Sequence, residues 1–156
     1  LIMVLLYSFT SENESSSQML NTVNKLREKG CHCGREYMPP VAPLAWNKVL
    51  KESAFDHAKD MSRHNYFSHY NSKGLSIGKR MDQYNYPWRF VGENIGEGQR
   101  SFREVFVDWK NSYSHCKMMM NPKMKEMAVA RYDRFWVQHF GIAPWPSTNI
   151  AYSRYY

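Results

Sequence analysis

A chain of 156 residues, of which 43% are hydrophobic and 15% aromatic, has the size of one domain with one apolar core. Its formal net charge of +7 would suit an anionic partner. The basic residues are scattered among acidic ones without a dense basic run, so we expect no specific nucleic-acid binding.

Residues 1–7 form an apolar run, Leu-Ile-Met-Val-Leu-Leu-Tyr, and residues 8–18 that follow are polar. The run is too short to span a bilayer, and no initiator Met or positively charged start precedes it. We interpret residues 1–17 as a truncated export signal with a polar linker; a buried N-terminal strand is the alternative. The protein is therefore expected to be secreted, or periplasmic or attached to the cell surface.

Residues 15–29 are predicted to form an amphipathic helix, because apolar side chains such as Met19 and Val23 recur at helical spacing and Gly30 follows the last turn. Residues 31–43 contain Gly34 and three prolines. So many breakers predict an irregular strap across the surface.

Residues 47–63 repeat apolar side chains every three or four positions and predict a second helix that packs on a sheet. His57 lies on or beside that apolar face, and we interpret it as a hydrogen-bonded structural histidine rather than a ligand. Residues 65–74, which include Phe67 and His69, are predicted to be a loop.

Residues 76–83 predict a short third helix that buries Met81 and Tyr84, and residues 89–95 predict a strand. Glycines lie on both sides of Glu93, which indicates a close backbone approach near that carboxylate.

Ser101 and Glu104 have the spacing of a capping box, in which each side chain satisfies a free backbone N–H at a helix start. The helix is expected to end near Asn111, so that residues 112–115 form a tight loop or short turn. The methionines at 118–120 are interpreted as core filling.

Residues 126–132 and 135–140 predict two strands of a hairpin that turns near Asp133. The irregular order of helices and strands favours an α+β fold over a doubly wound parallel sheet. For the C-terminal tail, residues 143–156, the sequence does not decide between packing on the body and extending away from it.

Short motifs in a fixed order cover most of the chain. They are Leu44-Ala45-Trp46-Asn47, Tyr66-Phe67-Ser68-His69, Gly92-Glu93-Asn94-Ile95, Trp109-Lys110-Asn111-Ser112, His115-Cys116 and Asn121-Pro122. Together they resemble the cysteine-rich secretory protein, antigen 5 and pathogenesis-related 1 (CAP) superfamily, also called the SCP domain, in its short bacterial-type form. The resemblance implies a CAP/SCP domain over residues 18–142 with a three-layer α-β-α sandwich around a mostly antiparallel sheet.

In the resembled family, two histidines and two glutamates commonly line a cleft that can hold a divalent metal. The resemblance assigns the histidines to His69 and His115 and the first glutamate to Glu93. Ser112 stands where the second glutamate is usual, so the set is incomplete. Asn94, Ser112 and Ser114 are expected to contact the cleft residues without binding the metal themselves.

Three roles are open for Glu93. Two imidazoles and a carboxylate suit Zn²⁺ or another divalent cation, with water completing the shell as in a catalytic zinc site. Alternatively, Glu93 only accepts a hydrogen bond from His69 or His115 and orients the ring, which leaves a weak two-histidine site. The third interpretation is a polar network that fixes the cleft and performs no chemistry.

The three cysteines are Cys31, Cys33 and Cys116, an odd number. Cys31 and Cys33 are too close in sequence to bridge without strain, so one of them is expected to reach Cys116. In similar bacterial sequences a cysteine at the position of Cys33 recurs with one after the His matched by His115, which implies a disulfide between Cys33 and Cys116. A Cys-His-Cys metal knuckle is the alternative, although it lacks a second ligand pair at suitable spacing.

We therefore predict a secreted, monomeric binding or extracellular interaction module, rather than an enzyme, with an unknown extracellular ligand. The alternatives are a metal-dependent hydrolase that acts on a peptide, an ester or an envelope polymer, and a lipid or sterol carrier.

Overall fold

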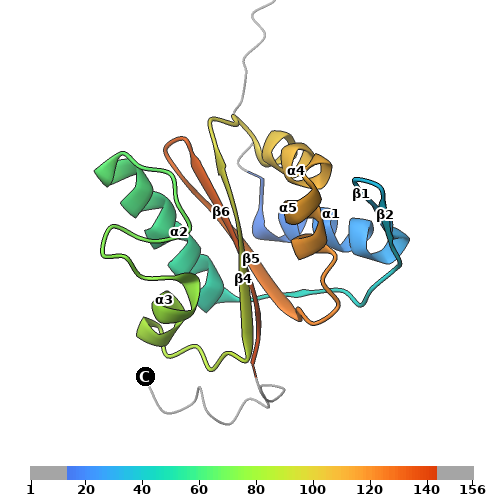
Figure 1. Cartoon of the computed structure of the whole chain (residues 1–156), viewed down its shortest axis with the longest axis horizontal. Helices are drawn as coiled ribbons and strands as arrows, with labels where there is room; N and C mark the ends of the chain where they lie inside the picture. The colour runs from blue at the N-terminus through green and yellow to red at the C-terminus, as the bar shows by residue number, and fades with distance from the viewer. Residues whose placement is uncertain (1–13, 144–156) are drawn as a thin grey trace, which may run out of the picture.

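The computed structural model describes residues 14–143, and two groups of helices enclose a sheet in it (Figure 1). The predicted export signal and most of the C-terminal tail lie outside the described residues. The helices are α1 (Ser16–Lys29), α2 (Lys48–His64), α3 (Ile77–Gln83), α4 (Phe102–Asn111) and α5 (Tyr113–Met119). The strands are β1 (Cys31–Cys33), β2 (Glu36–Met38), β3 (Ala45–Trp46), β4 (Phe90–Glu97), β5 (Glu126–Tyr132) and β6 (Phe135–Ile142).

The central sheet has the strand order β3-β5-β6-β4, which places β4 at one edge. β5 and β6 form the predicted hairpin, and Asp133 in its turn has a positive φ of 54°. β4 is antiparallel to β6, whereas the short β3 is parallel to β5, so the sheet is mostly antiparallel as predicted. β1 and β2 pair separately as a small antiparallel hairpin.

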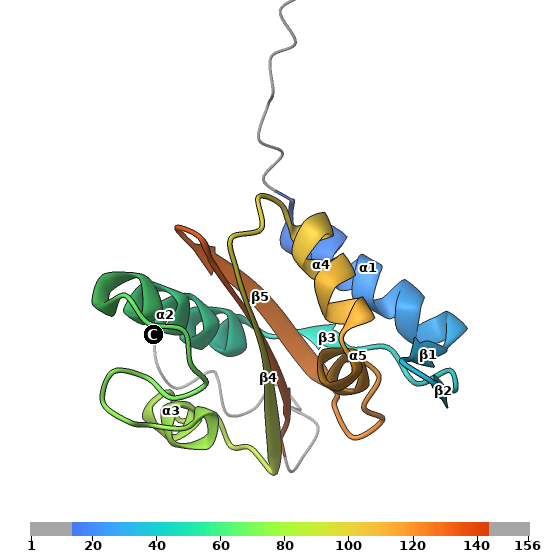
Figure 2. The same cartoon turned by 45° about the horizontal axis from the view of Figure 1, so that its top comes forward.

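The sheet separates two helical layers, with α2 and α3 on one face and α1, α4 and α5 on the other (Figures 1 and 2). On the α2 face, Ala58 and Met61 pack with Ile95 and Val137. On the opposite face, Trp109 belongs to a larger core that joins α1 and α4 to the sheet. This arrangement confirms the predicted three-layer α-β-α sandwich.

Side-chain caps fix where the helices begin. Asn47 accepts a hydrogen bond from the backbone N–H of Leu50 at the start of α2, and Ser101 accepts one from Glu104 at the start of α4. The second hydrogen bond of the predicted capping box, from the backbone N–H of Ser101 to the Glu104 carboxylate, is replaced by another. The Glu104 carboxylate accepts from the N–H of Arg100 at 2.8 Å, one residue before the expected partner.

Three local predictions are wrong. Residues 31–43 are not wholly irregular, because Gly34, with φ of 59°, allows β1 and β2 to reverse before the prolines. Residues 112–115 do not form a loop: only Ser112 is extended between two helices, and His115 lies within α5. Tyr84 is half-buried rather than buried, because it follows the last residue of the short α3.

Among residues 14–143, the helices are all too short or too polar to cross a membrane.

Candidate functional site

Consecutive residues of β4 point to opposite faces of the sheet, as in any strand. Glu93 pairs in register with His139 and faces α2 and α3, whereas Asn94 pairs with Gln138 and faces α4 and α5. Because β4 is an edge strand, groups from both helical layers can meet beside it. This edge is where the structure places the predicted cleft residues.

The Glu93 carboxylate is buried and both of its oxygens accept hydrogen bonds. Oε1 accepts from Nδ1 of His69 at 2.7 Å, and Oε2 accepts from Nε2 of His139 at 2.7 Å. Oε2 also pairs with the buried guanidinium of Arg80. The carboxylate is therefore the centre of a charged, hydrogen-bonded cluster.

The cluster holds Glu93 in its ionised form. Burial by itself would raise the pKa of Glu93, but hydrogen bonds from His139 and His69 and the charge of Arg80 hold that pKa far below its usual value. Burial lowers the pKa of His139 and lowers the pKa of His57 to about 4. Both imidazoles are consequently neutral near pH 7 and serve as hydrogen-bond donors.

The loop that carries His69 is fixed by the same cluster. His57, predicted to be structural, donates from Nε2 to the carbonyl of Ser68 at 2.9 Å. Arg80 donates to the carbonyl of His69 at 2.7 Å. With Nδ1 bonded to Glu93, the nitrogen of His69 left for another partner is Nε2, on a side chain that is 55% exposed.

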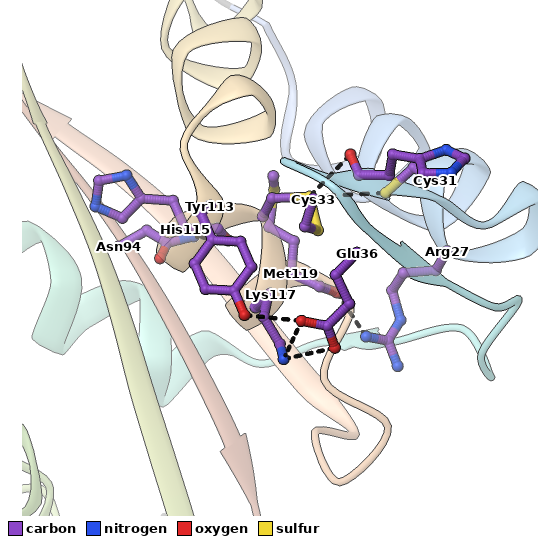
Figure 3. Close-up of a disulfide and its surroundings, with 11 residues drawn as sticks. Arg27, Cys31, Cys33, Glu36, Asn94, Tyr113, His115, Lys117 and Met119 are labelled. Atoms are coloured by element: carbon purple, nitrogen blue, oxygen red, sulfur yellow. Dashed lines mark hydrogen bonds and ion pairs between the residues drawn. A yellow bond between two sulfur atoms is a disulfide. The ribbon is translucent and has the colours of Figure 1, made fainter.

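His115 approaches from the opposite layer. Asn94 donates to its carbonyl at 3.2 Å and to Oε1 of Gln138 at 3.0 Å, which ties α5 to the sheet. Burial, and then the charge of His69, lowers the pKa of His115. In Figure 3 the His115 ring lies on the side of α5 that faces β4, away from the disulfide.

A groove of about 410 Å³ lies beside β4 and includes His115. Phe67 lines it from the α2 side, and Trp109 and Ser112 line it from the α4 side. Ser112 thus lines this groove together with His115, whereas His69 and Glu93 are not among the lining residues and Ser114 is exposed.

Residues 14–143 contain one group of three or more potential ligand atoms that all lie within 4.8 Å of one another, and it is Cys31, Cys33 and Cys116. His69, Glu93 and His115 therefore do not form a preassembled three-ligand set. Since both oxygens of Glu93 have protein partners, its position fits the orienting role better than that of a ligand.

Sequence reasoning missed Arg80 and His139 as partners of Glu93. His139 had a detectable signal, because alternation along its strand directs it inward with Val137. Arg80 had none, since only the tertiary contact of α3 with β4 reveals its carboxylate partner.

The disulfide implied by the family resemblance is confirmed. Cys33 and Cys116 are bonded, with Cα atoms 5.5 Å apart and a sequence separation of 83 (Figure 3). The bond joins β1 to α5, and Cys116 directly follows His115 in the sequence. With these two thiols in a disulfide, the Cys-His-Cys knuckle does not describe this arrangement.

Comparison with known sequences agrees with this description. Residues 20–140 match the family described as "Cysteine-rich secretory protein family". An uncharacterized membrane protein of Bacillus subtilis, YlbC, is 28% identical over 129 residues, which are 83% of this chain and 35% of that protein. An uncharacterized B. subtilis protein, YkwD, is 32% identical over 102 residues, or 64% of this chain and 40% of that protein. The chain thus spans less than half the length of these relatives.

Solved structures show the same architecture. An extracellular protein containing a SCP domain from Bacillus anthracis superposes with a TM-score of 0.72 at 28% identity, over 81% of this chain and 39% of that one. An outer surface protein from Borrelia burgdorferi gives a TM-score of 0.70 at 18% identity, over 81% of this chain and 91% of that one. The second likeness concerns the fold alone.

Proposed function

Because this chain belongs to the cysteine-rich secretory protein family, we propose that it is an extracellular binding module whose cleft reversibly binds a divalent cation, such as Zn²⁺, between His69 and His115. The extracellular location is supported by the similar SCP-domain protein of B. anthracis, which is described as extracellular. The cation would supply a positive charge and open coordination positions to an incoming anionic or carbonyl ligand.

The observation that carries the proposal is the 2.7 Å hydrogen bond from Nδ1 of His69 to Glu93. Histidines that ligate a metal almost always donate their other N–H to a carboxylate or a carbonyl, which fixes the tautomer and the ring orientation. Here the bond assigns the proton to Nδ1 and leaves the lone pair on Nε2, in an exposed side chain.

His115 is suited to be the second ligand. Its pKa is lowered by burial and by the charge of His69, so it is neutral near pH 7 and available to a cation. With two protein ligands rather than three or four, the site should bind weakly and release its ion readily.

Two features support binding rather than catalysis. Glu93 is held ionised by three donors, so it is a poor proton acceptor at neutral pH. Ser112 occupies the position at which the family usually has a second glutamate, and its hydroxyl is not a general base near pH 7.

The test is calorimetric titration of the protein with Zn²⁺, beside His69→Ala and His115→Ala. His64→Ala, at the exposed end of α2, is the matched control. We expect the heat of binding to be lost in both cleft variants and kept in the control. Equal heats in all four proteins would rule out this cation site.

The same proteins discriminate the alternatives. Hydrolysis of a peptide, ester or envelope polymer that disappears in both cleft variants would support the metal-dependent hydrolase. Solubilisation of a sterol or fatty acid that persists in both would support a carrier function elsewhere on the molecule.

A further inference from the structure

Three sulfur atoms gather where the β1–β2 hairpin meets α5. Cys33 and Cys116 form the buried disulfide, and each is 0% exposed. The free thiol of Cys31 is partly buried, and its Sγ lies 3.7 Å from Sγ of Cys116. All three sulfurs lie within 4.8 Å of one another. A free thiol is thus in van der Waals contact with a disulfide, and it is the most exposed of the three residues.

We propose that Cys31 is an exchange thiol through which the buried disulfide reacts with external thiols and disulfides. In the internal step the Cys31 thiolate attacks Sγ of Cys116. A Cys31–Cys116 bond forms, the Cys33–Cys116 bond breaks, and Cys33 leaves as a thiolate that takes up the proton lost by Cys31. The step is an isomerisation with no net oxidation.

The geometry directs the attack to Cys116 rather than to Cys33. Cys31 and Cys33 are alternate residues of one strand, whose Cα atoms lie about 6.6 Å apart, near the upper limit for a disulfide. Cys116 is on another element and already lies against β1, with its Sγ 3.8 Å from the carbonyl oxygen of His32. Cys31 lies beside the existing bond, so rotation about its Cα–Cβ bond must bring its sulfur into line.

Contacts around Glu36 keep the hairpin on α5 while the bonds exchange. Its carboxylate accepts hydrogen bonds from the Tyr113 hydroxyl at 2.7 Å and from the Lys117 ammonium at 2.8 Å (Figure 3). These polar contacts join β2 to α5 independently of the disulfide. The proposed exchange requires the same docking of the hairpin in both disulfide isomers.

Proximity rather than an acidic thiol makes the step feasible. Burial raises the pKa of the Cys31 thiol, and the charge of Lys110 partly opposes that effect. The thiolate is therefore a minor species near neutral pH. The contact of the two sulfurs, 3.7 Å apart, compensates by a high effective concentration.

The isomerisation makes the buried bond accessible to solution chemistry. In the Cys31–Cys116 isomer an external thiolate can attack the partly exposed Sγ of Cys31, forming a mixed disulfide and freeing the Cys116 thiol. A second external thiol then attacks the mixed disulfide, restores the Cys31 thiol and leaves as the external disulfide. Two electrons pass to the protein, and the reverse sequence oxidises it.

The first experiment measures reduction of the folded protein by glutathione, followed by alkylation and intact-mass analysis at intervals. Wild type is compared with Cys31→Ser, and His32→Ala is the control because it changes the same strand but keeps all the sulfurs. We expect reduction to be slower by about tenfold or more in Cys31→Ser and unchanged in the control. Equal rates in wild type and Cys31→Ser would overturn the proposal.

A second experiment does not depend on Cys31→Ser. Cys33→Ser and Cys116→Ser are oxidised by glutathione disulfide, and their linkages are mapped by peptide mass spectrometry without reduction. A Cys31–Cys116 bond is expected in Cys33→Ser, whereas Cys116→Ser should form mixed disulfides with glutathione. Folded Cys33→Ser that keeps Cys31 and Cys116 unlinked would overturn the proposal.

Discussion

Glu93 and Asn94 are neighbours on β4, yet they build two different kinds of polar region on opposite faces of the sheet. Glu93 forms a charged cluster with Arg80 and the imidazoles of His69 and His139. Asn94 forms a neutral pair of hydrogen bonds with Gln138 and with the backbone of α5. Each region binds one of the two predicted cleft histidines: the charged cluster binds the ring of His69, and the neutral pair binds the backbone carbonyl of His115.

The difference shows how one strand can set the geometry of a two-sided cleft. Glu93 fixes the ring of His69, whereas Asn94 fixes the backbone carbonyl of His115. Removing one partner from the charged region should lower the free energy of unfolding much more than removing one from the neutral region, because it leaves a buried charge uncompensated. A substitution in the neutral region should cost less stability.

Glu93→Gln should give the largest effect. The amide keeps the shape but leaves the buried Arg80 guanidinium without its carboxylate, which should cost about 3–5 kcal/mol of unfolding free energy. Urea denaturation followed by tryptophan fluorescence measures this loss.

Glu97→Gln is the matched control, since Glu97 is on the same strand as Glu93 and its exposed carboxylate pairs with Arg134. An exposed ion pair contributes at most about 1 kcal/mol. Similar losses in the two variants would mean that burial of the charge does not distinguish the Glu93 region.

The stability of the charged region should also fall in mild acid. The pKa of His57 is about 4 in the folded protein against an ordinary value of 6.5, so the unfolded chain binds more protons between these values. Stability from the neutral ring is complete above pH 6.5 and decreases as pH falls toward 4. The expected loss is about 3 kcal/mol, measured by urea denaturation at pH 7 and pH 4.

His57→Gln should reduce this acid sensitivity, and His64→Gln, at the exposed end of the same helix, should not. The lowered pKa of Glu93 adds to the loss only as the pH approaches and falls below 4.5, where the carboxylate of the unfolded chain takes up protons. An unfolding free energy that does not change between pH 7 and pH 4 would contradict the burial of a neutral His57.

Much of the fold could be predicted from local patterns. The period of apolar residues located α2, and the hydroxyl of Ser101 located the start of α4. The hairpin in residues 31–38 was missed because proline content suggested breakage, whereas the prolines follow the hairpin. The helical position of His115 was missed because only one extended residue, Ser112, separates two helices.

For the candidate site, the sequence indicated residues but not their hydrogen-bond partners. The family resemblance indicated His69, Glu93 and His115, and the structure brings Glu93 to His69 directly. The sequence does not show which other side chains bind the carboxylate oxygens of Glu93. Arg80 and His139 occupy Oε2 because α3 and β6 pack against β4, a consequence of tertiary structure rather than of any local pattern.

Asn94→Ala tests the neutral region and should have a smaller effect than Glu93→Gln. It removes two hydrogen bonds and leaves Gln138 buried with less than its full set of partners, at a cost of about 1–3 kcal/mol. Urea denaturation gives the loss. A loss as large as that of Glu93→Gln would remove the contrast between the two faces of β4.

His69→Gln should have the smallest effect on stability although it removes a cleft histidine. His69 and His139 both donate to Glu93, but the side chain of His69 is 55% exposed and that of His139 is 0% exposed. Water can replace the bond of an exposed donor, so His69→Gln should cost at most about 1 kcal/mol, whereas His139→Gln also disturbs packing and should cost more. Urea denaturation of the two variants, beside their Zn²⁺ titrations, separates the roles. Loss of the zinc heat with little loss of stability in His69→Gln assigns this ring to binding, and a stability loss as large as that of His139→Gln would make it a structural member of the charged cluster.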